Sequence, residues 1–259
     1  MILDDIVEKR KEQLKREKEN FPLEEMKQMA ANSKRVSLDF KVALRTDNIA
    51  IISEVKKASP SKGIISGDFR PAEQAKAYEQ AGANAISCLT EEHYFKGAGK
   101  YLADIRANVN LPILRKDFIF DEYQIYETKV LGADAVLLIA AILQEEEILN
   151  FYRLAKSLGL YCLTEVHNEE ELQKVIRCKC DIIGINNRDL KTFHVDLDTT
   201  KHLAELIPYD AVLVSESGMK NGTDLRMVKE YGADAVLIGE TLMRSEDIKG
   251  TIDDLRGGL

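Results

Sequence analysis

The chain has 259 residues, a length that suits one large α/β domain or two small ones, and 45% of the residues are hydrophobic. That share is enough for a sizeable core and argues against wholesale disorder. The formal net charge of −8 argues against broad binding to nucleic acids or to acidic membranes. An anionic small molecule could bind only at a local basic pocket.

The N-terminal residues, the apolar runs and the cysteines indicate the cellular compartment and whether a metal site is expected. The first residues mix acids and bases, unlike a secretory signal, and the longest apolar run, 135–143, is too short to span a bilayer. Cys88 and Cys162 lie in apolar runs and are predicted to be buried thiols. Cys178 and Cys180 form a C-x-C without a second pair, so we expect no metal or other cofactor and a cytoplasmic protein.

The first 48 residues are predicted to be mostly helical. Asp4 and Asp5 lie in the first turn of a charged helix whose basic residues follow, as the helix dipole prefers. Pro22 is predicted to open a second helix. We expect this extension to form a lid or plug over one end of the fold that follows, without being an independent domain.

Short strands rich in Val, Ile and Leu then alternate with helical patterns. Three of the predicted helices are 72–81, after Pro71, then 145–158 and 169–176. Such alternation predicts a parallel sheet with right-handed crossovers. The eight predicted strands are 50–55, 85–89, 112–115, 135–139, 161–165, 182–185, 211–215 and 235–238.

An internal repeat decides between a barrel and an open sheet. AGANAIS, LGADAVL and YGADAVL place glycines at 82, 132 and 232, and KCDIIGI from Lys179 is a degenerate fourth copy. Each copy predicts a helix that ends at a glycine, followed by a buried strand. No G-x-G-x-x-G follows the first strand, which weakens the dinucleotide-binding alternative. We therefore predict a (β/α)8 TIM barrel over 49–259 with an N-terminal helical extension over 1–48, as one domain.

Polar residues stand where six of these apolar strands end. In a parallel barrel, chemistry is built at the carboxyl ends of the strands and in the loops that follow them. Alternation along the first strand puts the side chains of Glu54 and Lys56 on one face, toward the barrel mouth. The other strand-end residues are Lys116, Glu165, Asn186, Arg188, Glu216, Ser217, Gly218, Gly239 and Glu240.

Any one of these charges could belong to an ordinary ion pair. Their convergence indicates function, because burying many charges in one mouth is costly. Lys56, Lys116 and Arg188 would face Glu54, Glu165 and Glu216, a set that suits an anionic substrate and general acid–base chemistry. Neighbouring cations would lower the pKa of Lys116 and the glutamates would raise it, so two effects oppose each other.

The last two loops predict a phosphate site. Ser217 and Gly218 follow the seventh strand, and Gly239 precedes a short helix after the eighth. Backbone N–H groups at these positions commonly bind phosphate in such barrels, although the glycines could instead serve only tight turns. None of the four histidines fits a catalytic pattern, and His93, in the second loop, is the only one expected near the mouth.

The motifs resemble indole-3-glycerol phosphate synthase along essentially the whole chain. The order and spacing of several stretches carry this resemblance, which is to the single-function form. The stretches are ISEVKKASPSKG (52–63), CLTEEHYFKG (88–97), LPILRKDFIFDEYQI (111–125), LGADAVLLI (131–139), CLTEVHNEEEL (162–172), IGINNRDL (183–190), VSESGM (214–219) and ADAVLIGETLM (233–243).

The resemblance implies a decarboxylating ring closure in tryptophan biosynthesis. The substrate would be 1-(2-carboxyphenylamino)-1-deoxy-D-ribulose 5-phosphate, and the products indole-3-glycerol phosphate, carbon dioxide and water. It implies that Lys116 is the general acid and that Glu165 is a general base or electrostatic stabiliser. Glu54 and Lys56 would form a second acid–base pair that serves dehydration.

The same resemblance implies the binding residues. Lys56 would also reach the anionic groups of the substrate, with Ser59 nearby, and Phe95 and Phe118 would line the anthranilate pocket. Three further polar contacts are implied for Asn186, Arg188 and Glu216. Ser217, Gly218, Gly239 and Glu240 would bind the phosphate. Because an ionised glutamate repels phosphate, we expect the Glu240 side chain to turn away and its backbone N–H to bind.

Two other functions compete with this interpretation. A class I aldolase or isomerase could use Lys116 as a Schiff-base nucleophile on a phosphate-binding barrel. A non-catalytic barrel could bind a phosphate or a partner, but it would have no need for Glu54, Lys56, Lys116 and Glu165 together. We expect a small phosphorylated substrate, no nucleic-acid or membrane partner, and a monomer or weak homodimer.

Overall fold

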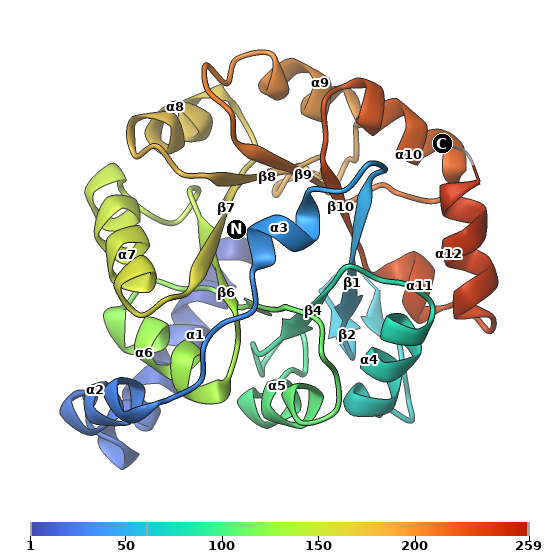
Figure 1. Cartoon of the computed structure of the whole chain (residues 1–259). Helices are drawn as coiled ribbons and strands as arrows, with labels where there is room; N and C mark the ends of the chain where they lie inside the picture. The colour runs from blue at the N-terminus through green and yellow to red at the C-terminus, as the bar shows by residue number, and fades with distance from the viewer. Residues whose placement is uncertain (1, 61, 258–259) are drawn as a thin grey trace.

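Eight parallel strands close into a barrel in the computed structural model, which describes residues 2–60 and 62–257. β1 pairs with β4 on one side and β10 on the other, so the ring has no open edge, and Figure 1 shows it along its axis. The predicted TIM barrel is confirmed. Its strands are β1 (Ala50–Val55), β4 (Ala85–Leu89), β5 (Ile113–Lys116), β6 (Ala135–Ile139), β7 (Tyr161–Val166), β8 (Ile182–Asn186), β9 (Val212–Glu216) and β10 (Ala235–Ile238).

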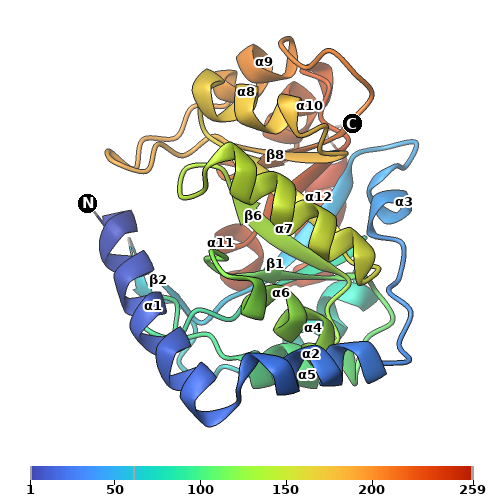
Figure 2. The ribbon, with the colours of Figure 1, turned by 90° about the vertical axis from the view of Figure 1, so that its left-hand side faces the viewer.

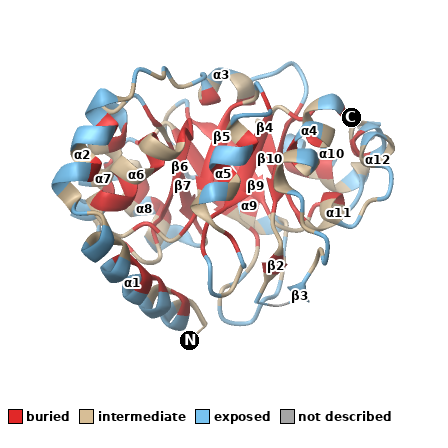
Figure 3. Ribbon diagram, turned by 90° about the horizontal axis from the view of Figure 1, so that it is seen from below, coloured by how far each residue is buried: buried red, intermediate tan, exposed pale blue. Residues whose placement is uncertain are grey.

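Helices follow the strands and form the outer layer. Figure 3 shows the buried strands enclosed by helices whose outer faces are exposed. One apolar cluster fills the barrel and two others lie between strands and helices, as expected for strands buried on both faces. The outer helices are α4 (Pro71–Gln80), α5 (Gly99–Arg106), α6 (Glu122–Leu131), α7 (Glu145–Ser157), α8 (Glu169–Arg177), α9 (Asp198–Ala204), α10 (Gly222–Glu230), α11 (Glu240–Met243) and α12 (Ile248–Arg256).

The repeated glycines perform the turn that the sequence predicts. Gly132 is the C-cap of α6 with φ 85°, and Gly82 and Gly232 adopt φ 89° and 94° one residue after the C-caps of α4 and α10. In the degenerate fourth copy, Lys179 takes this left-handed conformation with φ 52°. The fourth copy therefore keeps the left-handed turn although a lysine stands where the other copies have glycine.

Several predicted boundaries were wrong by one residue. β5, β8 and β9 each extend to a polar residue that the prediction placed after the strand: Lys116, Asn186 and Glu216. Pairing continues through them, because Leu89 opposes Lys116 and Asn186 opposes Glu216. The apolar pattern ends before the ladder does, so these side chains stand on rigid strands rather than on loops.

The N-terminal extension reaches both ends of the barrel. It consists of α1 (Ile2–Asn20), α2 (Leu23–Asn32) and α3 (Phe40–Leu44), and Pro22 is the N-cap of α2. In Figure 2, α1 and α3 lie on opposite sides of the barrel. Phe40 and Leu44 of α3 join the cluster inside the barrel and close its amino end.

Two further features complete the fold. A small antiparallel hairpin, β2 (Ala58–Ser59) and β3 (Gly63–Ile64), stands in the loop after β1 and was not predicted. None of the helices in the described part of the chain combines the length and the apolar character that a membrane span requires. The ends of the predicted domain, residues 1 and 258–259, lie outside the described residues.

Candidate active site

A cavity of about 550 Å³ opens at the carboxyl ends of the strands. Its volume is within the range of small-molecule sites, and its lining combines apolar side chains with many charged and polar ones. Every site residue predicted from the sequence lines it. These residues are Glu54, Lys56, Ser59, Phe95, Lys116, Phe118, Glu165, Asn186, Arg188, Glu216, Ser217, Gly218, Gly239 and Glu240.

Lys116 is at the centre of the charged residues. Its Nζ lies 3.1 Å from Glu165 Oε2 and 2.7 Å from Glu216 Oε2, so three strands meet at one ammonium group. Burial alone would lower the pKa of Lys116. The charges of Glu216 and Glu165, with Glu54 behind them, outweigh burial and raise that pKa well above its ordinary value. The raising effect of the glutamates predicted from the sequence therefore prevails, and the effect that opposes it is burial rather than the neighbouring cations.

The two glutamates around Lys116 titrate in opposite directions. Burial would raise the pKa of Glu165, but Lys116 and His167 hold it well below its ordinary value. For Glu216, burial and repulsion by Glu165 outweigh Lys116 and raise the pKa to about 7. When the pKa values of two neighbouring carboxyl groups are moved apart in this way, the pair can hold a single proton near neutrality.

One oxygen of Glu216 is left without a partner. Its Oε1 is buried and forms no hydrogen bond with any described residue. A Cβ at Gly184 would overlap this oxygen, so the glycine of β8 gives the carboxyl group its space. An unpaired buried acceptor that lines a cavity is available to a hydroxyl or N–H donor of a ligand.

Glu54 and Lys56 form a second ion pair in the cavity. Their side chains share one face of the chain at the end of β1, as strand alternation predicts. Gly239, after β10, packs against them: a Cβ there would overlap Glu54 Oε1 and lie 2.7 Å from Lys56 Nζ. The first strand and the last loop therefore meet at this pair.

The loops after β9 and β10 expose backbone to the cavity. Ser217 and Gly218 have φ 67° and 96°, two consecutive left-handed residues, and such turns form concave groups of N–H donors. Gly239 and Glu240 begin α11. The Glu240 carboxylate accepts a 3.1 Å hydrogen bond from Arg244 and lies 3.6 Å from Lys62. Its charge is thus engaged by side chains of the protein.

Arg188 is the third predicted cation. Its backbone N–H donates to Asn186 Oδ1 at 3.1 Å, which fixes the start of the loop after β8. The guanidinium makes no ion pair with another described residue, unlike Lys56 and Lys116. It is therefore the cation with its charge free for an anionic ligand.

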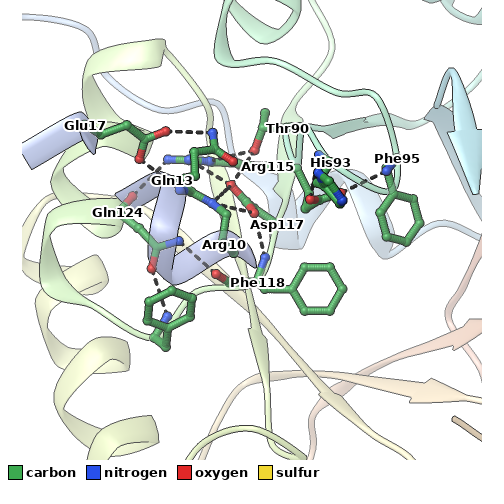
Figure 4. A network of polar contacts seen from close by, with 12 residues as sticks. Arg10, Gln13, Glu17, Thr90, His93, Phe95, Arg115, Asp117, Phe118 and Gln124 are labelled. Atoms are coloured by element: carbon green, nitrogen blue, oxygen red, sulfur yellow. Dashed lines mark hydrogen bonds and ion pairs between the residues drawn. The ribbon is translucent and has the colours of Figure 1, made fainter. Parts of the chain in front are cut away.

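An aromatic pair forms another part of the cavity wall. The rings of Phe95 and Phe118 lie 6.1 Å apart at 39° (Figure 4). Buried Glu91 holds the Phe95 loop, because its carboxylate accepts backbone N–H groups of His93, Tyr94 and Phe95. His93 packs on Tyr94 and is not among the residues that line the cavity.

Sequence reasoning missed the part that α1 plays. Ile2, Leu3 and Ile6 line the cavity, and Arg10 donates to Asp117 Oδ1 at 3.2 Å, beside Lys116 (Figure 4). The apolar face of α1 was a signal for packing, but it could not show against what. Arg115 also donates to Asp117, at 3.0 Å, so the loop after β5 is held from two sides.

His167 was also missed. It directly follows β7, and its Nε2 lies 3.2 Å from Glu165 Oε1. Its ring Nδ1 lies 3.0 Å from Glu171 Oε2. A lone histidine in a sequence carries no signal of two glutamate neighbours, and Glu171 is brought to it by the first turn of α8.

No grouping of three or more His, Cys, Asp or Glu side chains in the described residues could hold a metal ion. All four cysteines are buried and unpaired.

A family model described as "Indole-3-glycerol phosphate synthase" matches residues 3–255. An indole-3-glycerol phosphate synthase from Alkaliphilus metalliredigens is 49% identical over 260 residues, covering 100% of this chain and 99% of that protein. Another from Acetivibrio thermocellus is 51% identical over 258 residues, covering 99% of each.

Solved structures show likeness of fold only. The 3-hexulose-6-phosphate synthase from Salmonella typhimurium superposes with a TM-score of 0.67 over 82% of this chain and 98% of that one, at 12% identity. At so low an identity the match supports the barrel and no residue-level role.

Proposed function

The chain belongs to the indole-3-glycerol phosphate synthase family, and from that premise we propose how its cavity divides the reaction among its residues. It is a decarboxylating lyase of tryptophan biosynthesis. It converts 1-(2-carboxyphenylamino)-1-deoxy-D-ribulose 5-phosphate into indole-3-glycerol phosphate, carbon dioxide and water.

Lys116 is the general acid of ring closure in this proposal. Its ammonium donates a proton to the ribulose carbonyl oxygen while the carboxylate-bearing ring carbon attacks the carbonyl carbon. The observation that supports this role is the placement of Nζ between Glu165 and Glu216, in the cavity that the loops after β9 and β10 also line. The raised pKa of Lys116 means that the proton is present before substrate arrives.

Glu165 acts beside it as a general base or electrostatic stabiliser. Once Lys116 has given up its proton, the amine needs a nearby source from which to recover one, and Glu216 holds a proton near neutrality because its pKa is raised to about 7. Loss of carbon dioxide then restores the aromatic ring. Proton transfer from Glu216 thus returns Lys116 to its charged form and leaves Glu216 ionised beside it.

Glu54 and Lys56 serve the dehydration that completes the indole. The hydroxyl formed in ring closure leaves as water, which requires one group to give it a proton and another to take a proton from the ring system. An acid and a base already in contact at the end of β1 can do both. Lys56 also faces Gly239, so it can contact the substrate phosphate from the same position.

The remaining lining residues bind and orient the substrate. Ser217, Gly218, Gly239 and Glu240 offer backbone N–H groups to the phosphate, and Phe95 and Phe118 hold the anthranilate ring. Arg188 pairs with a substrate anion, Asn186 and Ser59 supply polar contacts, and the unpaired oxygen of Glu216 accepts from a substrate donor.

The charge on Lys116 opposes the Schiff-base alternative. A Schiff-base lysine attacks as the neutral amine, so such enzymes lower its pKa. Two carboxylates in contact with Nζ do the reverse. This contrast favours proton transfer over covalent catalysis.

We further propose that residues 1–259 act as one domain, as a monomer or weak homodimer in the cytoplasm, with a small phosphorylated molecule as partner. The net charge of −8 supports the absence of nucleic-acid or acidic-membrane binding. The proposed chemistry uses no cofactor.

A direct assay tests the function. The protein is mixed with the anthranilate-derived substrate, and indole fluorescence and carbon dioxide are followed together. We expect the two products in equal amounts and no covalent adduct after borohydride treatment. Substrate binding without either product would contradict the proposed reaction, and a borohydride-trapped adduct on Lys116 would favour the aldolase alternative.

A further inference from the structure

His167 stands behind Glu165 and is used by no step above. Its side chain is 7% exposed, that of Glu165 is 6% exposed, and His167 does not line the cavity. It cannot touch a substrate in this position. Any contribution to the reaction must therefore act through Glu165.

A short chain of contacts fixes the imidazole ring. Glu171 Oε2 lies 3.0 Å from His167 Nδ1 and accepts the His167 backbone N–H at 2.8 Å. Asn168, the N-cap of α8, donates its side-chain amide to Glu171 Oε1 at 2.7 Å and accepts the Glu171 backbone N–H. The helix start thus locks Glu171, and Glu171 locks the ring.

The ring stands between two carboxylates. Nδ1 faces Glu171, and Nε2 lies 3.2 Å from Glu165 Oε1 as an ion pair rather than a well-directed hydrogen bond. Both nitrogens can donate only when both carry a proton, so this arrangement selects the imidazolium. Burial opposes that charge, but the two glutamates outweigh it and raise the pKa of His167 to about 10.

The two oxygens of the Glu165 carboxylate therefore face two different cations. Oε1 is turned to His167 and Oε2 to Lys116 Nζ at 3.1 Å. With a cation at each oxygen, the carboxylate has little freedom to rotate or to take up a proton. Without the imidazolium, only Lys116 would hold it, and Glu216 would repel it across that ammonium.

We propose that His167 is a positioning residue, held by Glu171, that orients the Glu165 carboxylate on Lys116 and keeps it ionised during ring closure. This inference depends on the proposed role of Glu165. The contacts involved form a chain from Glu171 at the start of α8 through His167 to Glu165, which contacts the general acid Lys116. The chain transfers no proton to substrate and acts by orientation and charge.

The direction of the pH effect follows from the charges around Glu165. Lys116 faces it from β5, Glu216 from β9 and His167 from its own loop, while Glu54 of β1 acts through Lys116 and Glu171 of α8 through His167. Removing the imidazolium removes one of the two cations that lower the pKa of Glu165. The carboxyl pair then takes up its proton at higher pH.

The test compares His167→Gln with His202→Gln in the full chain. His202 also contacts a glutamate, Glu169, but it is 60% exposed and does not line the cavity, which makes it a matched control. For His167→Gln we expect kcat to fall about 10–100-fold. KM should change little, and the acid limb of the kcat/KM profile should move up by about one pH unit. His202→Gln should behave as the wild type.

Glu171→Gln keeps the inference testable if His167→Gln does not fold. It leaves the histidine in place and removes its anchor, so we expect a smaller loss of kcat and a shift of the acid limb in the same direction. Near-ultraviolet circular dichroism establishes that each variant is folded.

Two results would overturn the inference. Folded His167→Gln and Glu171→Gln variants with wild-type kcat and an unmoved acid limb would show that Glu165 needs no positioning. A rise in KM in these variants, with kcat and the acid limb unchanged, would show the same. Glu165→Gln separates this failure from failure of the proposed function. Loss of turnover in Glu165→Gln beside an unaffected His167→Gln leaves the function standing, whereas wild-type turnover in Glu165→Gln removes the premise of both.

Discussion

The two ends of the barrel each bury a carboxylate, and the two carboxylates differ in how completely their oxygens are paired. Asp134, just before β6, accepts the backbone N–H groups of Leu38 and Ile113 and pairs with Arg35 and Arg106. Both of its oxygens are fully used. Glu216, at the end of β9, has one oxygen on Lys116 and one with no partner among the described residues.

The difference separates stability from chemistry. At the amino end, a satisfied carboxylate ties the extension to the barrel while α3 seals the interior with Phe40. At the carboxyl end, like charges crowd one ammonium, and the pKa of Glu216 is raised to about 7 by burial and by Glu165. Such incomplete pairing costs stability and is retained where a ligand completes it.

Replacement of Lys116 should have the largest effect. For Lys116→Ala we expect kcat to fall about 10³-fold, because the carbonyl oxygen loses its proton donor, while substrate binding weakens far less. Steady-state kinetics and a binding titration on the same preparation measure both. Equal losses in the two quantities would count against the general-acid role.

A lysine at the other end of the barrel is the matched control. Lys129 is also largely buried, and its Nζ donates to the backbone carbonyl of Arg35 at 2.9 Å. Lys129→Ala should lower the unfolding free energy and leave kcat unchanged. A comparable loss of kcat would mean that the two ends are not functionally separate.

A methyl group at Gly239 should have a smaller, local effect. Its Cβ would overlap Glu54 Oε1 and crowd Lys56 Nζ, so Gly239→Ala displaces the ion pair at the point where we place the phosphate. We expect kcat/KM to fall about 10-fold or more, consistent with a displaced positioning group. Gly67→Ala, where a Cβ meets no atom within 4 Å, should be silent. Equal behaviour of the two variants would argue against crowding at the ion pair.

The smallest expected effect is a pH slope in stability. The pKa of Glu216 rises from 4.5 to about 7 on folding, so between these values the folded protein holds a proton that the unfolded chain has lost. This contribution to the unfolding free energy is present below pH 4.5 and is lost as pH rises through 7. Urea unfolding at pH 5 and pH 8 should show it in the wild type and not in Glu216→Gln. The same slope in both proteins would assign it to another group.

The sequence predicts the barrel and the lining residues because local patterns encode them. Apolar runs define the strands, left-handed glycines end the helices, and the polar residue that closes each run is the one that enters the cavity. The family motifs then name the aromatic wall and Ser59, which periodicity alone would have left as ordinary loop residues.

Long-range pairing is what local patterns cannot encode. Arg10 meets Asp117 across 107 positions of the chain, and nothing near either residue specifies the other. Gly184 gives space to Glu216, and His167 becomes an imidazolium only because α8 brings Glu171 to it. Strand bounds failed at Lys116 for a related reason, since backbone pairing continues after the apolar pattern stops.

The division between the two ends is tested most directly by a pair of isosteric substitutions, Asp134→Asn and Glu216→Gln, with unfolding free energy and kcat/KM measured for each. Asp134→Asn should lower the unfolding free energy by about 3 kcal/mol, because it leaves Arg35 and Arg106 without their counter-charge, and should leave kcat/KM unchanged. Glu216→Gln should lower kcat/KM at least 10-fold and leave stability at pH 7 within about 1 kcal/mol of the wild type. Loss of activity in Asp134→Asn at full folding, or wild-type activity in Glu216→Gln, would contradict the account.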